Sequence, residues 1–522
     1  MSINFNSVSE KQFWQQESVH YLSGIQRGIE KESLRINAQG MISQVEHPKA
    51  LGSTLTHRYI TTDYSEALLE FITPATDERF APIDWLEDIH TFVYQRLNDE
   101  LLWATSMPCI MGNDEDIPLA YFGTSNSGRM KTVYREGLGH RYGRFMQTIA
   151  GVHFNFSFPK QLWQALQQAI DGHQLNSQDF QSDRYMGMIR NFQRDSWIIP
   201  MLFGASPALC ESFLKGRPTK LDLLVPGTRF GKFATSLRMS DLGYQNNVQS
   251  ALRVSTNDLA SYVATLEHAI RTEDPYYKSI GVKVDDVYKQ LNANVLQIEN
   301  EFYSNIRPKR TCQSGERPTK ALSNRGIEYI EVRALDINLF DKVGVTQQQL
   351  DFLDVFLLNC AMQSSCPITE REEAETKKNF ARVVKGGRDP ELYLWRKNRQ
   401  VSAKILAHNL FDSFDEAAEL LDKAYNTHDY SQVLKTLRSQ IDEPETTISG
   451  QIVQQIQSRG DGFFPYAMEL SKKYRDYFAT RELSGSRAHV LEEEVQKSID
   501  KQLAMEQGDD KTFEEFLASY FA

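Results

Sequence analysis

The sequence has few cysteines, no long apolar run and no excess of positive charge. Its five cysteines are scattered through 522 residues without the spacing of a zinc site or a CxxC motif, so we expect thiols in a reducing compartment. No apolar run could span a bilayer, and the first residues lack the basic and apolar regions of a signal peptide. We therefore expect a cytoplasmic protein with no membrane partner. The net charge of −11 also argues against nucleic acid as a partner.

Glycine-rich loops that hold phosphates are absent as well. The nearest approach, between Gly227 and Lys232, has the wrong spacing and no hydroxyl after the lysine, and no GxGxxG stands at a strand-to-helix turn. If ATP binds, its phosphates must be held by metal ions and cationic side chains. Arg307, Lys309 and Arg310 are candidates, although a solvated basic loop after a strand would explain them equally well.

Two regimes of hydrophobic pattern divide the chain near residue 345. The first mixes helices with strand-like segments, and we predict strands at 26–36, 57–63, 67–73, 151–158, 291–303 and 326–335. The short connection between the second and third of these indicates a hairpin. The second regime has mainly helical periodicity. We predict an α+β protein, with an antiparallel sheet covered by helices over residues 1–345 and a mostly helical region packed on it over 346–522.

The spacing of Glu30 and Glu32 is the strongest chemical signal in the sequence. Residues of equal parity share a face of a strand, so both carboxylates lie on the face of Leu34 and Ile36. An anion that leaves water loses several kcal/mol of hydration free energy even after the protein relaxes. A cation should therefore compensate the pair, and a divalent metal ion that prefers oxygen ligands is the natural candidate.

Other predicted strands also carry acids or a histidine beside apolar residues. These are Asp63, Glu70, His153 and Glu331, with Arg333 on the face of Glu331. Each alone has an ordinary alternative: a solvated strand glutamate, a hydrogen-bonded core histidine, or a partly exposed ion pair between Glu331 and Arg333. Together with the first pair, however, they place five acids and one histidine on one sheet face, which is costly unless metal ions bind there. Oxygen-rich ligation favours Mg²⁺ or Mn²⁺, which commonly hold phosphates.

Several segments together resemble bacterial glutamate–cysteine ligase of the proteobacterial type, also called γ-glutamylcysteine synthetase. They are 24–37, 60–74, 121–126, 131–138, 142–153, 202–207, 237–244, 294–303 and 326–333. The resemblance covers nearly all of residues 20–345 in order. Beyond about residue 365 it reduces to a general helical character.

The resemblance implies a glutamine-synthetase-like catalytic fold, with a curved antiparallel sheet and helices on its outer face. It implies that ATP drives the joining of the γ-carboxylate of L-glutamate, through γ-glutamyl phosphate, to the amine of L-cysteine. The products are γ-glutamylcysteine, ADP and phosphate, and the reaction is the first step of glutathione synthesis. We expect ATP, glutamate and cysteine as small-molecule partners, and a monomer.

The resemblance also assigns roles to individual residues. Arg333 stabilises charge on the transferred phosphoryl group, and the metal ligands are Glu30, Glu32, Asp63, Glu70, His153 and Glu331. The residues that bind the acceptor cysteine are Tyr64, Tyr134, Leu138, Gln147, Ile149, Arg238, Tyr244 and Tyr303. Tyr64 departs from the family pattern, which has a phenylalanine there, so its hydroxyl could alter the choice of acceptor.

Three other functions are compatible with parts of this pattern. A ligase on the same fold could use a different amine, and it would differ in the acceptor pocket. A metal-dependent hydrolase could use the same acids without ATP, but the cations Arg333 and Arg307 to Arg310 argue against it. A non-catalytic binding protein would be expected to have lost a metal ligand, and none is missing from the pattern.

Overall fold

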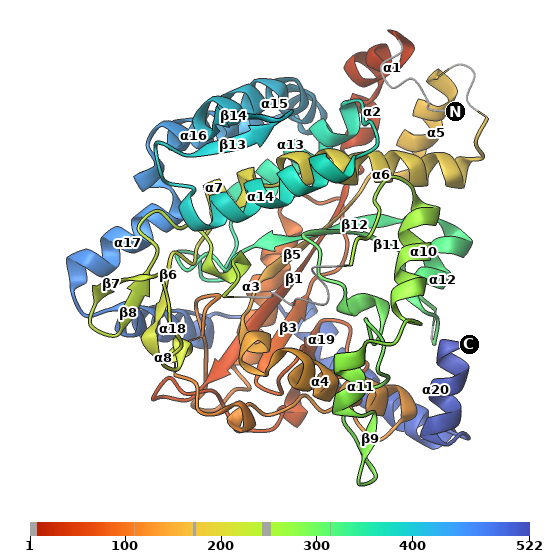
Figure 1. The fold of residues 1–522 in the computed structure, drawn as a ribbon, viewed down its shortest axis with the longest axis vertical. Helices are drawn as coiled ribbons and strands as arrows, with labels where there is room; N and C mark the ends of the chain where they lie inside the picture. The colour runs from red at the N-terminus through yellow and green to blue at the C-terminus, as the bar shows by residue number, and fades with distance from the viewer. Residues whose placement is uncertain (1–7, 109, 171–173, 243–251, 314) are drawn as a thin grey trace.

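A computed structural model describes residues 8–108, 110–170, 174–242, 252–313 and 315–522 (Figure 1). Within these residues the centre is a seven-stranded sheet in the order β11-β12-β5-β1-β3-β2, with β4 paired to β1. Its strands pair antiparallel throughout, which confirms the predicted α+β fold. They are β1 (Gln26–Ile36), β2 (Ile60–Thr62), β3 (Leu68–Ile72), β4 (Leu101–Leu102), β5 (Val152–Ser157), β11 (Ile306–Lys309) and β12 (Tyr329–Leu335).

Most of the predicted strands are confirmed. The strand at 26–36 is β1 over its full length, and β2, β3, β5 and β12 lie inside the segments predicted for them. The predicted hairpin is also confirmed, since β2 pairs with β3 through Thr62 and Leu69. Alternation of apolar and polar residues is a local signal, which explains why these strands can be read without knowledge of their neighbours.

The predicted strand at 291–303 is wrong. There the Leu291 N–H donates to Gln297 Oε1 (2.9 Å), and Asn292 Nδ2 donates to the Gln297 carbonyl (3.0 Å). These side-chain bonds replace ladder bonds, so the segment turns and ends in the 3-10 turn Glu299–Glu301. The basic segment that follows, for which a solvated loop was one of two interpretations, is strand β11. Pro308 is tolerated because β11 lies at the sheet edge, where a missing N–H interrupts no further pairing.

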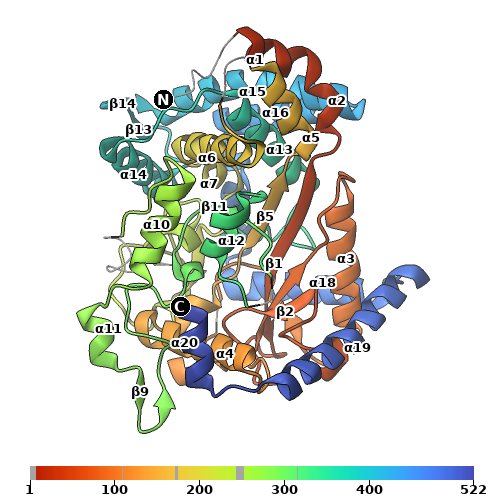
Figure 2. The ribbon, with the colours of Figure 1, turned by 90° about the vertical axis from the view of Figure 1, so that its right-hand side faces the viewer.

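The two faces of the sheet differ in character. One face carries fully buried apolar side chains, among them Ile29, Phe71 and Phe154, and packs against α3 (Ala81–Tyr94). Figure 2 shows α3 and α18 (Phe463–Thr480) on this side of the sheet, and α4 (Asn126–Tyr142), α10 (Leu259–Ala269) and α12 (Pro318–Arg325) on the other. The acids of β1 point to that second side.

The remaining elements before residue 345 surround this sheet. The helices are α1 (Val8–Gln12), α2 (Val19–Leu22), α5 (Lys160–Ala169), α6 (Ser177–Asp195), α7 (Ile198–Phe203), α8 (Glu211–Leu214) and α11 (Pro275–Ile280). A small sheet in the order β6-β8-β7 and a hairpin of β9 and β10 complete the set. Their strands are β6 (Ala208–Cys210), β7 (Asp222–Val225), β8 (Thr228–Phe230), β9 (Lys283–Val284) and β10 (Val287–Tyr288).

The region after residue 345 is mostly helical, as predicted, but it contains one hairpin of β13 (Tyr393–Arg396) and β14 (Arg399–Ser402). A single cluster of buried apolar residues has members from Phe13 to Leu491, so it includes residues on both sides of position 345. The division into 1–345 and 346–522 therefore remains a prediction. Besides α18, the helices are α13 (Gln347–Met362), α14 (Glu370–Gly386), α15 (Ala403–Tyr425), α16 (Asp429–Asp442), α17 (Ile448–Arg459), α19 (Gly485–Gly508) and α20 (Phe513–Phe521).

The cysteines depart in part from the expectation of thiols. Cys210 is disulfide-bonded, whereas Cys312, Cys360 and Cys366 are free. None of the helices in the described parts of the chain has the length and apolar character needed to cross a bilayer.

Candidate active site

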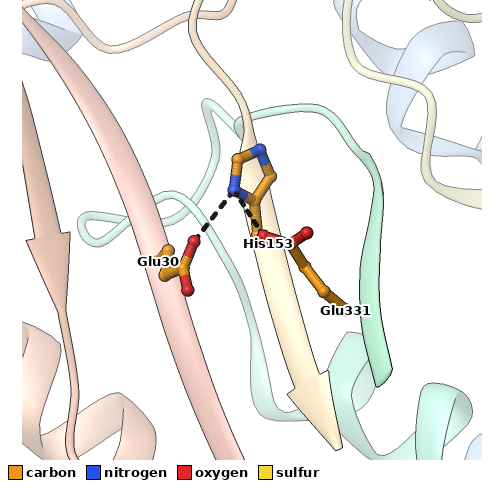
Figure 3. Close-up of side chains that lie close together, drawn as sticks. All are labelled: Glu30, His153 and Glu331. Carbon is orange, nitrogen blue, oxygen red and sulfur yellow. Dashed lines mark hydrogen bonds and ion pairs between the residues drawn. The ribbon is translucent and has the colours of Figure 1, made fainter. Parts of the chain in front are cut away.

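Three of the predicted metal ligands meet on the polar face of the sheet. The strand register places Glu30 directly opposite His153, and His153 Nδ1 lies 3.3 Å from Glu30 Oε2 and 3.8 Å from Glu331 Oε1. Figure 3 shows these side chains converging from β1, β5 and β12. One ligand atom from each residue lies within 4.8 Å of the others, a spacing at which one ion can contact all three.

The other three predicted ligands lie around this group. Glu32 is opposite Glu70 in the strand register, and its Oε1 is 4.0 Å from His153 Nε2. Its second oxygen accepts the backbone N–H of Gly151 at 2.5 Å. Asp63 is the most exposed of the set, with 38% of its side chain accessible. The structure thus places a tight group of three residues beside a looser group of three.

The electrostatics of the looser group indicate an excess of negative charge. Burial raises the pKa of Glu32, and the charge of Asp63 raises it further. Burial also raises the pKa of Glu70 well above its usual range, and the neighbouring carboxylates Glu30, Asp63 and Glu32 add to this. Because each acid hinders ionisation of the next, a bound cation would favour the charged forms of all of them.

The tight group is compensated in a different way. Burial opposes ionisation of Glu331, yet the charges of Lys309 and Arg333 hold its pKa well below the usual value. Burial and the charge of Arg333 lower the pKa of His153, so the imidazole is neutral and can act as a ligand. Burial likewise opposes ionisation of Glu30, but the hydrogen bond with His153 and nearby cations lower its pKa.

The donor set fits a hard divalent ion. Glu331 is 1% exposed, and its Oε2 has no hydrogen-bond partner among the described residues. Asn155 donates from Nδ2 to Glu30 Oε1 (2.9 Å), while its own Oδ1 is buried without a partner. Buried oxygens that lack a donor are expected where a cation binds. The imidazole and carboxylates therefore suit Mg²⁺ or Mn²⁺.

Cationic side chains surround Glu331, one member of the tight group. Arg333 Nη1 lies 3.1 Å from Glu331 Oε1, whereas its Nε is buried without an acceptor. Lys309 Nζ lies 3.5 Å from the same Glu331 oxygen. Arg307 is opposite Glu331 in the register and donates to the carbonyls of Asn300 (3.0 Å) and Phe302. Two of the predicted phosphate-binding cations thus flank Glu331.

A cavity of about 300 Å³ adjoins these cations, and we call it the β11 cavity. Aromatic and aliphatic side chains cover part of its wall, and the third predicted phosphate-binding cation, Arg310, lines it as well. Its size is at the lower end of that of small-molecule sites, and its mixed lining is typical of them. The lining residues used below are Tyr262, Leu266, Arg307, Lys309, Arg310, Leu322 and Tyr329.

A buried arginine, Arg238, lies beside Gly151 and acts on the charge of Glu32. Arg238 is 3% exposed, its Nη1 lies 3.7 Å from Asp336 Oδ1, and its buried Nε has no acceptor among the described residues. It approaches Gly151 so closely that no side chain would fit there. The hydroxyl of Tyr303 donates to the sulfur of Met239, the residue after Arg238 (3.1 Å). The unmade bond of Arg238 is suited to a carboxylate.

Helix α4 contributes residues that the sequence reasoning identified only in part. Tyr134 and Leu138 were predicted, but Lys131 and Arg135 lie on the same helix face, at i, i+3, i+4 and i+7 spacing. Arg135 donates to the Asp63 carbonyl and lies 3.8 Å from the Asp63 carboxylate. Burial lowers the pKa of Lys131 to about 8, and the charge of Arg135 adds to this effect. Helical spacing alone could have identified both cations.

The remaining predicted residues have mixed outcomes. Gln147 and Ile149 are buried in and just after the 3-10 turn Phe145–Thr148. Tyr64 is 1% exposed, and its hydroxyl packs against Gly139 of α4 without a hydrogen-bond partner in the described residues. Tyr244 lies outside the described residues.

Comparison with known proteins decides the family. The model of the glutamate-cysteine ligase family matches residues 11–383 of this chain. The chain belongs to the glutamate–cysteine ligase family. Related ligases are similar over almost the whole length: that of Alcanivorax borkumensis is 51% identical over 505 residues, 96% of both chains. That of Pseudomonas aeruginosa is 45% identical over 495 residues, 95% of this chain and 94% of its own.

Solved structures agree with this assignment. Glutamate–cysteine ligase of Francisella tularensis, in complex with AMP, has a TM-score of 0.90 to this chain at 34% identity, over 95% of this chain and 97% of its own. A bifunctional glutathione synthetase of Pasteurella multocida has a TM-score of 0.74 at 26% identity, over 94% of this chain and 58% of its own. The predicted fold, family and enzyme class are confirmed.

The activity follows from the family. This ligase couples glutamate to cysteine at the expense of ATP and forms γ-glutamylcysteine, the first step of glutathione biosynthesis. A hydrolase and a non-catalytic binding protein, two of the alternatives that the sequence left open, are thereby excluded.

Proposed function

We propose that Mg²⁺ or Mn²⁺ binds at the polar face of the sheet and that the six acidic and imidazole residues of this face are its ligands. The proposal rests on three ligand atoms, one each from Glu30, His153 and Glu331, that lie within 4.8 Å of one another. In addition, Glu331 has a buried oxygen with no hydrogen-bond partner among the described residues. Bound ions would neutralise charge on phosphate oxygens and on the γ-carboxylate. The proposed ligands are Glu30, Glu32, Asp63, Glu70, His153 and Glu331.

The same face would hold ATP through the β11 cavity. Tyr262 and Leu322 offer apolar and aromatic surface for the base, and Arg307 and Lys309 lie between that surface and Glu331. Phosphates placed there would reach the metal ligands without a glycine-rich loop. The AMP bound by the Francisella tularensis ligase supports nucleotide binding in a protein of this fold.

Arg333 would act at the phosphoryl group itself. A carboxylate is a poor acyl donor because its leaving group would be an oxide, whereas γ-glutamyl phosphate has a good leaving group. Transfer of the phosphoryl group depends mainly on positioning and on charge neutralisation. The Arg333 Nε, buried and without an acceptor beside Glu331, is a donor suited to a phosphoryl oxygen.

The acceptor would bind beside Arg238. The free Nε of Arg238 suits the carboxylate of cysteine. Tyr303, next to Met239, and the α4 residues Tyr134 and Leu138 lie where they could enclose the rest of the acceptor. The other proposed contacts are Tyr64, Gln147, Ile149 and Tyr244.

We also propose a monomer in the cytoplasm. The proposed metal ligands, the β11 cavity and the described acceptor residues all come from one chain, so the site needs no partner subunit. Sedimentation of the pure protein tests the oligomeric state, and an active dimer that loses activity on dilution would contradict it.

Replacement of Glu331 tests the metal site. Glu331→Gln keeps the shape but removes a charge, and we expect kcat to fall by about a hundredfold or more because phosphoryl transfer loses a ligand. Binding of Mn²⁺, followed by electron paramagnetic resonance, should weaken in parallel, while the protein remains folded. The matched control is Glu419→Gln, an exposed glutamate of α15.

One outcome would contradict the metal site, and another would contradict cysteine as the acceptor. Near-normal turnover of Glu331→Gln at ordinary Mg²⁺ concentrations would exclude Glu331 as a ligand. Rapid ADP release with glutamate and another amine, but not with cysteine or 2-aminobutyrate, would indicate the different ligase that the sequence left open.

A further inference from the structure

A second cavity lies close to the β11 cavity. It has a volume of about 190 Å³, is formed by α5, α6, α12 and the residue after β11, and is called the α6 cavity below. Among the residues that the structure describes, its polar lining consists of lysine, arginine, glutamine and serine side chains, and no aspartate or glutamate is part of it. The amide nitrogens of Gln178 and Gln181 already donate to the carbonyls of Asn324 and Ile327. The other charged or amide side chains of the lining are those of Lys160, Gln164, Gln167, Arg310 and Arg325.

Several of these donors have bonds left to make. Within the described residues, the Lys160 ammonium and the Gln164 amide have no hydrogen-bond or ion-pair partner. The Arg310 guanidinium has one ion-pair contact, at 3.7 Å to Glu328, whose Oε2 already accepts the N–H of Thr311. Lys160 and Gln164 are exposed to solvent and Arg310 is only weakly paired, so two positive charges and one amide line the cavity without a close acidic partner.

Arg325 defines the opposite wall and is itself neutralised. Its guanidinium pairs with Glu316 at 2.6 Å and donates to the Thr311 carbonyl at 3.0 Å. These contacts fix Arg325 in place, so the charge available to a ligand is that of Lys160 and Arg310.

We propose that the α6 cavity binds a small oxyanion, such as a carboxylate, phosphate or sulfate group. Lysine, arginine and amide donors, with no acid among the described residues that line the cavity, match the charge and the acceptor oxygens of such a group. The volume is below the roughly 300 Å³ at which sites for drug-sized ligands begin, so a second nucleotide does not fit. The ligand is therefore compact and anionic.

The position of Arg310 couples this site to ATP. Arg310 lines both the α6 cavity and the β11 cavity, and it follows β11 directly. An anion in the α6 cavity holds the guanidinium there, and ATP then binds without it. Coupling of binding free energies is reciprocal, so the anion weakens ATP and ATP weakens the anion. This coupling rests on the nucleotide position proposed above, whereas the anion site does not.

Crystallography with selenate tests the site itself. Crystals of the full chain grown without nucleotide and soaked in low-millimolar selenate should show an anomalous peak between Lys160 and Arg310. Lys160→Met removes one of the two charges without touching the β11 cavity, and the peak should disappear. The matched control Lys435→Met, an exposed lysine of α16, should keep it. No peak, a peak only in the β11 cavity, or a peak that Lys160→Met retains would overturn the site.

Kinetics with sulfate test the coupling. At constant ionic strength balanced with chloride, sulfate should raise the KM for ATP about fivefold in the wild type, the lower end of typical coupling, with kcat unchanged. The rise should be largely absent in Lys160→Met and unchanged in Lys435→Met. An equal rise in all three proteins would mean that sulfate acts in the nucleotide site, and this would overturn the coupling. A selenate peak without any effect on KM would overturn the coupling while the anion site stands.

Discussion

Gly151 is a single position at which one methyl group should disable acceptor binding. Its N–H donates to Glu32 Oε2 and its carbonyl accepts the N–H of Glu32 (3.0 Å). A Cβ at this position would lie 2.0 Å from Arg238 Nη2 and 2.5 Å from its Cζ. Arg238 is 3% exposed, so its guanidinium cannot move aside into solvent. Gly151→Ala must therefore displace Arg238 from its present position.

The size of the effect follows from the bond that is lost. A hydrogen bond to a charged group contributes about 1.5–3 kcal/mol, and each 1.4 kcal/mol corresponds to about tenfold. We expect kcat/KM for cysteine to fall by about ten- to a hundredfold in Gly151→Ala. The KM for ATP should change much less because neither Gly151 nor Arg238 lines the β11 cavity. Initial rates with each substrate varied in turn measure both quantities.

A matched glycine substitution controls for this experiment. A Cβ on Gly187 of α6 would meet Ser365 Cβ at 3.5 Å, an ordinary contact, so Gly187→Ala should keep full activity. A loss confined to cysteine in Gly151→Ala supports Arg238 as the acceptor contact. If kcat/KM for cysteine stayed within about twofold of the wild type in a folded Gly151→Ala protein, Arg238 would not bind the acceptor.

Three further predictions concern stability. Asp354→Asn leaves Arg27 as a buried unpaired charge, since both side chains are 0% exposed and pair at 2.7 Å. The loss of about 3–5 kcal/mol of stability should lower the thermal midpoint by about 3–5 °C. An unchanged midpoint would contradict this prediction. Burial lowers the pKa of His57 from 6.5 to about 4, so between these pH values the unfolded chain binds a proton at this residue and the folded protein does not. Stability should therefore fall by about 2 kcal/mol between pH 6.5 and 5.0 through this residue, and the difference between those two pH values should shrink in His57→Gln, as measured by urea denaturation. Tyr64→Phe removes a buried hydroxyl without a partner, so the midpoint should stay equal or rise while KM for cysteine is unchanged; a higher KM would show that the hydroxyl contacts the acceptor.

The sheet face illustrates how much of a site follows from alternation alone. Parity in the segment 26–36 put Glu30 and Glu32 on one face, and the strand has those bounds in the structure. A strand can be read from the sequence because its side chains alternate whatever lies beside it. The same reasoning failed at 291–303, where hydrogen bonds from Asn292 and to Gln297 redirect the backbone. It also missed strand β11, because Pro308 is compatible with a strand only at a sheet edge.

The chain's order of residues thus determined which side chains are acidic, which share a strand face and which family the motifs belong to. The tertiary structure alone decided that His153 meets Glu30 and Glu331 rather than Glu70, because cross-strand register depends on pairing between distant segments. It also decided that Arg310 lines both the α6 cavity and the β11 cavity. Neither cavity has a sequence signal, since each is enclosed by helices and strands far apart in the chain.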